Sequence, residues 1–330
     1  MSTHRGVSII GWGRAMPSKV ITNSDLEKMV DTSDEWIRTR TGIRERRVAN
    51  PEQAASDLAF DAAQAALKKA DLSPDRLGLI IVATVTPDMA FPATACLVQD
   101  RLGAKGVAAF DLEAGCSGFL YGLSVGHQFV QSATYDYVLI IGVDILSRIT
   151  NWEDRNTCVL FGDGAAAVIL GPGEPEQGIL STYLGSDGGG GKYLYLPAGG
   201  SRYPLDHEAL DQGLQYTQMN GPEVFKFAVR IMGEAALEVL KRAGLKLEQV
   251  TYLIPHQANQ RIIDAAAKRL RLPPERVLVN LDRYGNMSSA SIPVALAEAA
   301  DQGQFQPGDI LLLVGFGAGL TWGATVIRWG

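Results

Sequence analysis

The sequence predicts an α/β protein made of two duplicated halves, each with a mixed, mainly parallel sheet covered by helices. Two observations predict this class. Short apolar strands alternate with helical segments along most of the 330 residues, an order typical of parallel sheets buried between helices. The same order of elements also occurs twice, first between residues 79 and 142 and again between residues 251 and 315.

The first copy begins with the continuous apolar run 79–84, which has the length of a buried strand and is too short to span a bilayer. The elements expected after it are a helix at 93–102, a strand at 107–112, a turn at Gly115 and Cys116, an apolar helix to about residue 132 and a strand at 137–142.

The second copy follows the same plan. Its expected elements are a strand at 251–255, a helix at 257–270, a strand at 277–281, a turn at Gly285 and Asn286, a helix at 291–301 and a strand at 310–315. Cys116 and Asn286 therefore occupy equivalent positions, 170 residues apart. The glycine- and proline-rich segment 171–178 marks the seam, so we place the two halves at residues 1–172 and 173–330.

Ligands of such sheets gather at the carboxyl ends of the strands. His256 directly follows its strand, while Cys116 and Asn286 stand at the starts of two helices. We therefore expect these three side chains to meet at one site. The segment 161–164 has the pattern of a tight turn, and the glycine-rich segment 185–206 is either the border of a pocket or a plain surface loop.

Composition narrows the class of protein. A net charge of −6 argues against a general nucleic-acid binder. The three cysteines, Cys96, Cys116 and Cys158, form neither a metal-ligand pattern nor a disulfide framework. We therefore expect a reducing, cytoplasmic setting with no metal site, no signal peptide at the first residues and no membrane span.

Cys116 has the placement of a nucleophile. The N-terminus of a helix carries free N–H groups and partial positive charge, which lower the pKa of a thiol and can hold an oxyanion. Taken alone, Cys116 could instead be a buried structural cysteine, His256 a core histidine and Asn286 a turn or N-cap residue.

Six segments of the chain together carry a resemblance to a known family: 32–43, 115–119, 161–164, 255–259, 284–293 and 315–323. The chain resembles β-ketoacyl-acyl-carrier-protein synthase III, the family of condensing enzymes that initiates bacterial type II fatty-acid synthesis within the thiolase superfamily. The resemblance extends over nearly the whole chain. It implies a thiolase-like αβαβα layered fold and a homodimer.

The resemblance also implies a decarboxylative Claisen condensation. Cys116 would accept the acyl group of acetyl-CoA or of another short or branched acyl-CoA, and malonyl-acyl carrier protein (malonyl-ACP) would then give 3-oxoacyl-ACP, CoA and CO2. His256 and Asn286 would supply neutral donors to the enolate. The backbone N–H groups of Cys116 and Ala318 would hold the oxyanion. The family usually has glycine where Ala318 stands, and the donor survives this change unless the position needs a positive φ.

Trp36 and Arg40 lie four residues apart on a short predicted helix, where an indole and a guanidinium can enclose an adenine ring. The resemblance assigns Trp36, Arg40 and Arg155 to the adenine of CoA, and Asn259 to its pantetheine arm. It implies no metal and no organic cofactor, since CoA enters only as a thioester substrate.

A cluster of cations on this acidic chain predicts a docking patch for ACP, which is itself acidic. Arg261, Lys268 and Arg269 share one side of a predicted helix, and Lys226 adds a further charge. Gln257 completes the predicted contacts. An ordinary solvated helix face is the alternative.

Two phenylalanines are assigned to the acyl pocket by the resemblance. Phe91 would cross the dimer interface to line the pocket of the partner, and Phe316 would pack over the reactive cysteine. Both assignments depend on the family rather than on the residues themselves.

Other functions stay open. The closest is a related acyltransferase or starter-unit condensing enzyme of secondary metabolism, followed by a Cys-His hydrolase, which uses the same three residue types, and a non-catalytic CoA-binding module. Elongating condensing enzymes are disfavoured because they carry a second histidine where Asn286 stands. A thiolase is disfavoured because it needs a second reactive cysteine, and none follows Cys158.

Overall fold

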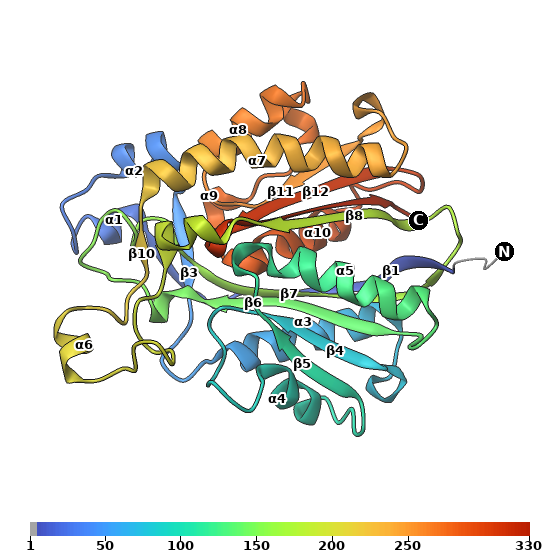
Figure 1. The fold of residues 1–330 in the computed structure, drawn as a ribbon, viewed down its shortest axis with the longest axis horizontal. Coiled ribbons are helices and arrows are strands. Elements are labelled where there is room, and N and C mark those ends of the chain that lie inside the picture. Colours follow the sequence, from blue (N-terminus) through green and yellow to red (C-terminus); the bar gives the residue numbers. More distant parts are fainter. Residues whose placement is uncertain (1–4) are drawn as a thin grey trace.

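The computed structural model describes residues 5–330; the first four residues, on which part of the signal-peptide prediction rests, lie outside it. Its larger helices are α3 (Ala55–Ala70), α4 (Thr94–Arg101), α5 (Gly118–Gln131), α7 (Gly221–Arg242), α8 (Gln260–Arg269) and α10 (Ser291–Asp301). They form three layers separated by two layers of strands, with α7 and α8 on one side, α5 and α10 in the centre, and α3 and α4 on the other side (Figure 1). This arrangement confirms the predicted fold class.

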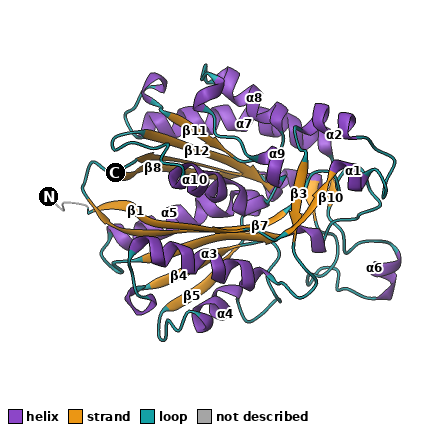
Figure 2. Cartoon of the chain, turned by 180° about the vertical axis from the view of Figure 1, so that it is seen from behind, coloured by secondary structure: helices purple, strands orange, loops and turns teal. Residues whose placement is uncertain are grey.

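The strands of both halves belong to one nine-stranded sheet in the order β5-β4-β6-β7-β1-β8-β13-β12-β11. Their bounds are β1 Gly6–Ala15, β4 Leu79–Ala83, β5 Ala108–Leu112, β6 Val138–Ile145, β7 Asp163–Gly173, β8 Gly178–Ser186, β11 Tyr252–Pro255, β12 Ile310–Gly317 and β13 Thr321–Arg328. Within residues 5–330, the strands of the two halves pair with each other at one position of this sheet, Val7 with Gly178, in parallel. Because this joint is so short, the two parts of the sheet spread apart and enclose α5 and α10 (Figure 2).

The sheet is mixed, as predicted, but parallel pairs do not dominate it. β4 is parallel to β5 and β6, and β11 to β12, whereas β7 and β13 are antiparallel to both of their neighbours. The reason is visible at the end of the chain, where only residues 318–320 connect β12 to β13. A connection this short can join only antiparallel strands. The predicted boundary between residues 172 and 173 falls at the end of β7.

The prediction of a strand at 277–281 is wrong. This segment makes a single bridge to Leu253 of β11, and then the side-chain amide of Gln257 takes the place of a neighbouring strand. Its Nε2 donates to the carbonyl of Leu278 at 3.1 Å, and its Oε1 accepts from the backbone N–H of Asn280 at 3.0 Å. A side chain therefore satisfies backbone groups that a strand would otherwise pair.

Smaller elements lie around the two copies. They are α1 Asn23–Leu26, α2 Asp34–Thr41, α6 His207–Asp211, α9 Leu281–Tyr284, β2 Lys19–Thr22, β3 Glu45–Val48, β9 Leu194–Tyr195 and β10 Gln218–Met219. Within residues 5–330, no helix combines the length and the apolar character needed to cross a bilayer.

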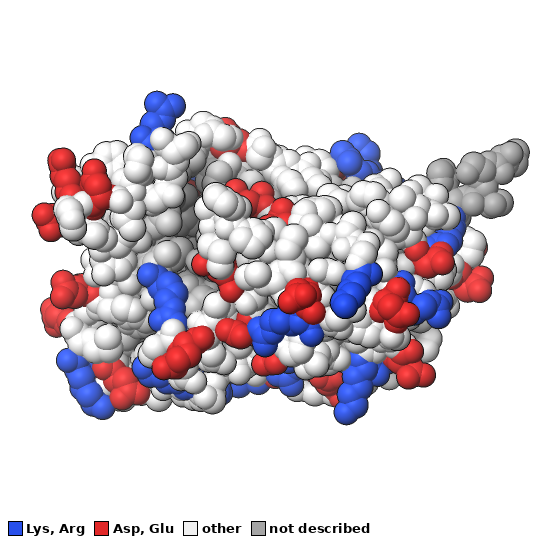
Figure 3. Space-filling model, turned by 90° about the horizontal axis from the view of Figure 1, so that it is seen from below, with Lys and Arg blue, Asp and Glu red and all other residues white. Residues whose placement is uncertain are grey.

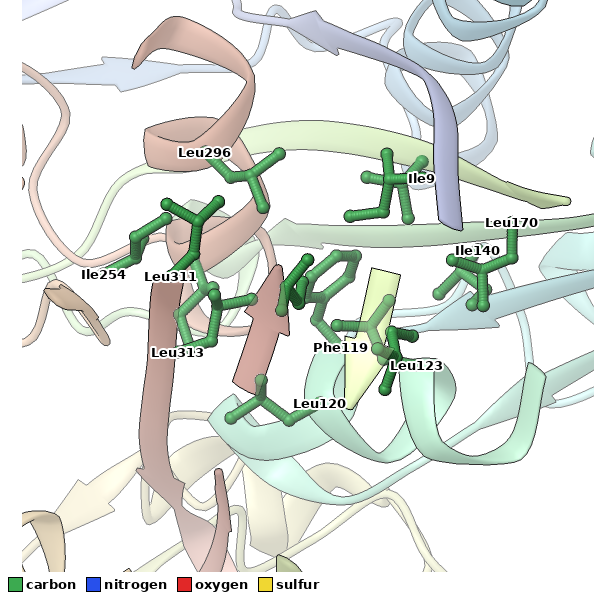
Figure 4. Packing of buried hydrophobic residues seen from close by; sticks show 14 of the residues in the cluster. Ile9, Phe119, Leu120, Leu123, Ile140, Leu170, Ile254, Leu296, Leu311 and Leu313 are labelled. Carbon is green, nitrogen blue, oxygen red and sulfur yellow. The ribbon is translucent and has the colours of Figure 1, made fainter. Parts of the chain in front are cut away.

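The core around α5 fixes the position of the central layer. Phe119, Leu120 and Leu123 of α5 are fully buried and point into the space between Ile140 of β6 and Leu313 of β12 (Figure 4). Burying such a side chain stabilises the fold by roughly 1.5–3 kcal/mol. The start of α5 is therefore held between the two parts of the sheet, close to the end of β12.

Candidate active site

Cys116 lies in the short 3-10 helix η2 (Gly115–Ser117), which leads directly into α5. Gly115 has a left-handed backbone with φ of 55°, and a Cβ there would lie 2.6 Å from the backbone nitrogen of Ala318. Only glycine fits such an approach. The fold thus places the cysteine where the start of α5 touches the end of β12.

The Cys116 thiol is protonated in this site. Burial raises its pKa to about 12, while the Ser288 hydroxyl and the backbone N–H groups of Cys116 and Ala318 act in the opposite direction. The residue is half-buried, and the surrounding protein removes enough water for desolvation to be the largest effect on its pKa. The N–H groups at the helix start lower this pKa, as predicted, but the loss of hydration outweighs them, so the net shift is upward.

Two backbone N–H groups converge on this sulfur. A Cβ on Gly317 would lie 2.3 Å from the nitrogen of Cys116, so η2 and the end of β12 are in direct contact. The N–H groups of Cys116 and Ala318 both stabilise the anionic sulfur. Ala318 does not have a positive φ. The left-handed residues are the two that follow it, Gly319 with a φ of 72° and Leu320 with a φ of 45°. Alanine therefore keeps the donor without strain.

His256 follows β11 and is held by its own backbone, whose N–H donates to the carbonyl of Val314 at 2.8 Å. Its side chain is 1% exposed, and its ring meets that of Phe316 edge-on at 5.4 Å. Burial lowers the pKa of His256 to about 3. The imidazole is consequently neutral at pH 7 and can act as an uncharged N–H donor.

Asn286 is fixed by a bridge to the segment before β7. Its backbone N–H donates to the carbonyl of Leu160 at 2.8 Å, and its carbonyl accepts from the N–H of Gly162 at 2.9 Å. Gly285 before it has φ of 67°. The side-chain Oδ1 accepts from the N–H of Ser288 at 2.9 Å. With its oxygen engaged in this way, the amide can present its NH2 group to a ligand.

The structure brings the predicted catalytic side chains together. Cys116, His256 and Asn286 line one cavity of about 140 Å³, together with Asn259 and Phe316. Cys116 also closes a second, mostly apolar cavity of about 540 Å³. Its lining includes Val85, Leu146, Ile149, Phe161, Leu196 and Ser288. The sulfur thus stands between a polar donor site and an apolar chamber.

The predicted CoA residues gather on the outside of α2 and α8. The guanidinium carbons of Arg40 and Arg155 each lie 4.9 Å from the centre of the Trp36 ring. Asn259 is the N-cap of α8 and donates from Nδ2 to the carbonyl of Arg40 at 3.0 Å. Asn259 therefore connects the cavity of Cys116 to this cluster.

Four of the predicted ACP contacts lie exposed on α7 and α8, namely Lys226, Arg261, Lys268 and Arg269. Arg269 is partly engaged, because its Nη1 donates to the carbonyl of Arg230 at 3.2 Å. The other three extend from the two adjacent helices. The structure thus supports a basic surface next to the cavity.

Two predicted roles need correction. Gln257 is fully buried and bound to the 277–281 segment, so it cannot contact a partner. Phe316 does not line the 540 Å³ chamber but packs on His256 in the smaller cavity, which Cys116 also lines. Phe91 is 84% exposed, and its predicted place in the pocket of a partner subunit stays a prediction.

Ser288 was not predicted from the sequence. It is 2% exposed, has a left-handed backbone with φ of 48°, and lines the apolar chamber beside Cys116. Its Oγ has no hydrogen-bond partner within the described chain at normal distance. Its place in the segment 284–293 was the only signal in the sequence.

Comparison with known proteins identifies the family. Models described as 3-oxoacyl-acyl-carrier-protein (ACP) synthase III and its C-terminal part match residues 110–188 and 240–329. The β-ketoacyl-acyl-carrier-protein synthase III of Caldanaerobacter subterraneus subsp. tengcongensis is 60% identical over 321 residues, which are 97% of each chain. The crystal structure of 3-oxoacyl-acyl-carrier-protein synthase III from Aquifex aeolicus is 50% identical, with a TM-score of 0.91 over 98% of this chain and 100% of that chain. The priming β-ketosynthase of a polyketide pathway is 33% identical, with a TM-score of 0.92 over 99% and 97%. The chain belongs to the 3-oxoacyl-acyl-carrier-protein synthase III family.

Proposed function

We propose that the protein primes fatty-acid synthesis by loading an acyl group from acyl-CoA onto Cys116 and condensing it with malonyl-ACP. The observation that carries this proposal is the shared cavity of Cys116, His256 and Asn286 beside an apolar chamber. A thiol nucleophile, two uncharged donors and a place for an acyl chain are what the reaction requires.

In the first step, the sulfur of Cys116 attacks the thioester carbon of acyl-CoA. The N–H groups of Cys116 and Ala318, which lie beside this sulfur, would donate to the negative charge that develops on the thioester oxygen. As the new C–S bond forms, the bond to CoA breaks and the thiol proton leaves with the CoA sulfur. The products are acyl-Cys116 and free CoA.

In the second step, malonyl-ACP loses CO2 and becomes an enolate. The N–H of neutral His256 and the NH2 group of Asn286 donate to the enolate oxygen. Because His256 carries no charge at pH 7, it stabilises the oxygen without readily giving its proton to the carbanion. The enolate carbon then bonds to the acyl carbon while the C–S bond to Cys116 breaks, giving 3-oxoacyl-ACP. The departing sulfur takes a proton from solvent, which restores the Cys116 thiol.

The chamber beside Cys116 favours an aliphatic primer. Leu146, Ile149 and Leu196 contribute to its lining, and within residues 5–330 the one charged residue of the lining is Glu113. An apolar pocket of this kind distinguishes chains that differ by one methylene by about 1–3 kcal/mol. Acetyl, short straight and branched acyl groups are therefore the substrates to compare.

CoA and ACP approach from the side of α2 and α8. The cluster of Trp36, Arg40 and Arg155 suits the adenine ring. Asn259 suits the pantetheine arm that leads to the cavity. The exposed cations on α7 and α8 suit an acidic carrier protein. No metal or organic cofactor takes part in these steps.

The active form is a homodimer in this proposal. β5 is the last strand of the sheet, and its outer edge has no partner within residues 5–330. Phe91 extends from the loop that follows β4. Seen from the side of α4 and β5, the molecule has a broad uncharged area bordered by mixed charges (Figure 3). These features support a second copy at this edge.

A starter-unit enzyme of secondary metabolism is the second candidate. It is favoured by the TM-score of 0.92 with the polyketide priming β-ketosynthase. The sequence identity of 33% to that protein, against 60% to the Caldanaerobacter synthase, favours the role in fatty-acid synthesis.

Intact-protein mass spectrometry tests the proposal. Wild type and Cys116→Ala are incubated with acetyl-, butyryl- or isobutyryl-CoA and then with malonyl-ACP. We expect an acyl adduct on wild type only, discharged as 3-oxoacyl-ACP. An adduct that water removes without malonyl consumption would indicate a hydrolase, and one that malonyl-ACP leaves untouched would indicate another transferase.

A further inference from the structure

A buried carboxylate without a counter-ion lies next to the site. Asp144, near the end of β6, is fully buried, and no ion pair of the described chain includes it. Glu298 in the second half is also buried, but Arg283 holds it through bonds of 2.7 and 3.0 Å. A buried charge without such a partner is costly, so its hydrogen bonds must compensate.

The two oxygens of Asp144 bind different parts of the molecule. Oδ1 accepts from the N–H of Val85 at 2.8 Å and from the hydroxyls of Thr84 and Thr86 at 3.0 Å each. Oδ2 accepts from the N–H of Ser289 at 3.1 Å and lies 2.7 Å from its hydroxyl. One side chain thus connects the loop after β4 to η7 (Ser288–Ala290), which belongs to the other half.

η7 is also the support of the Asn286 side chain. The N–H of Ser288 donates to Asn286 Oδ1 at 2.9 Å, and the next N–H, that of Ser289, donates to Asp144. Ser288 between them has φ of 48°, a conformation that residues with a Cβ rarely adopt. The surroundings must hold it there. β6 and η7 touch at Gly142, where a Cβ would lie 2.4 Å from the carbonyl oxygen of Ser289.

We propose that Asp144 is a positioning residue for the condensation step, which holds η7 against β6 and thereby directs the amide of Asn286 into the cavity. This inference rests on the proposed function. Asp144 makes no hydrogen bond to η2 or to η8 (Ala318–Leu320), which provide the N–H groups used in loading. Its negative charge raises the pKa of the Cys116 thiol, so the loss of that charge does not disfavour the nucleophile. Its replacement should therefore slow condensation without slowing loading.

The test is Asp144→Asn, studied in single turnovers of the full chain. The substitution keeps the shape of the side chain but replaces one acceptor oxygen by an NH2 group, which cannot accept from Val85 or Ser289. We expect loading of Cys116 by acetyl-CoA to stay within about threefold of wild type. Discharge of the acyl-enzyme by malonyl-ACP should fall about 30-fold, within the range that a misplacement of about 1 Å can cause.

Asp163→Asn is the matched control. Asp163 is equally buried and accepts from the N–H of Ala49 at 2.7 Å and of Ser147 at 2.9 Å, but it makes no hydrogen bond to η7. It should lower stability without separating the two steps. The inference is overturned if Asp163→Asn causes the same separation, or if Asp144→Asn slows loading and discharge equally.

Ser289→Ala gives a second, milder variant. It removes the hydroxyl that lies 2.7 Å from Asp144 Oδ2 and 2.8 Å from the carbonyl oxygen of Ala83, but it keeps the backbone N–H. Discharge should fall about fivefold, which corresponds to the net loss of about 1 kcal/mol of hydrogen bonding. The double variant should be no slower than Asp144→Asn. If Asp144→Asn does not fold, unchanged discharge in Ser289→Ala overturns the inference. Wild type that loads but is never discharged contradicts the proposed function itself and, with it, this inference.

Discussion

The two halves use the same backbone feature for different chemistry. In each half a left-handed glycine, Gly115 or Gly285, comes directly before the reactive residue, and a short 3-10 turn then leads into a buried central helix. The first half presents the thiol of Cys116 there, and the second presents the amide of Asn286. The duplicated fold therefore provides two positions with the same backbone arrangement, and the side chains at these positions can differ.

The sharpest way to break this equivalence is to remove each side chain in turn. Cys116→Ala should form no acyl adduct at all, because the nucleophile is gone. Asn286→Ala should still load acetyl-CoA but condense about 10²- to 10³-fold more slowly, the usual cost of one donor to a developing oxyanion. Quenched single turnovers followed by mass spectrometry measure both steps.

Cys96→Ala is the control for these variants, because Cys96 is exposed and lies outside both cavities. It should load and condense like wild type. An adduct on Cys116→Ala, or an Asn286→Ala variant that fails to load, would contradict the division of labour between the halves.

The two glycines offer a comparison of the backbones themselves. A Cβ at Gly115 would lie 2.6 Å from the nitrogen of Ala318, and one at Gly285 would lie 2.9 Å from the oxygen of Leu160. Both alanine variants also carry the cost of a left-handed residue, about 1–2 kcal/mol. We expect Gly115→Ala to lower the free energy of unfolding more than Gly285→Ala does, because its contact is closer.

Urea unfolding measures this difference in the free energy of unfolding. The rates of loading and condensation then show which part of the site each variant disturbs. Gly115→Ala should impair loading, whereas Gly285→Ala should impair condensation only. Gly103→Ala serves as a control, because Gly103 has a φ of 69° but a Cβ there would meet no atom within 4 Å. If all three variants lose the same stability, backbone strain rather than close contact governs both turns.

The repeat in the sequence made the meeting of Cys116, His256 and Asn286 predictable. Parallel strands carry their carboxyl ends to one edge, so residues at those ends converge whatever the details of the loops. The direction in which the pKa of Cys116 shifts was not predictable, because it depends on how completely the fold removes water from the thiol. The roles of Ser288 and Asp144 depend on backbone angles and on contacts between distant segments.

The prediction of a strand at 277–281 also failed because of a contact between distant segments. The apolar residues of 277–281 have the pattern of a strand, yet the amide of Gln257 binds the backbone that a neighbouring strand would pair. The strand propensity of a segment predicts its structure poorly where one buried side chain can form the backbone hydrogen bonds that a neighbouring strand would otherwise form. The prediction of Gln257 as a surface contact failed for the same reason.

The second half should also differ from the first in its response to pH. Burial lowers the pKa of His256 from its ordinary value of 6.5 to about 3 in the folded protein. Between these values the unfolded chain binds one more proton than the folded chain, so this histidine makes stability fall as pH decreases. From pH 6 to pH 5 the loss should be about 1 kcal/mol of unfolding free energy.

Comparison of wild type with His256→Gln isolates this contribution. Urea unfolding at pH 5, 6 and 7 should show wild type losing more stability than the variant as pH decreases. Parallel curves would mean that His256 can become protonated without cost in the folded protein. Its role as a neutral donor would then need revision.

The smallest expected effect concerns the surface that only the second half provides. Arg261→Ala and Lys226→Ala should each raise the KM for malonyl-ACP about threefold at low salt, because exposed charges contribute up to about 1 kcal/mol.

Lys241→Ala is the matched control, since Lys241 is exposed on the same helix, α7, but near its other end. Steady-state kinetics at low and high salt measure the effect, which screening should remove. Malonyl-CoA as acceptor should show no change. If Lys241→Ala raises KM equally, the general charge of the protein attracts ACP, and the patch on α7 and α8 has no special part in docking.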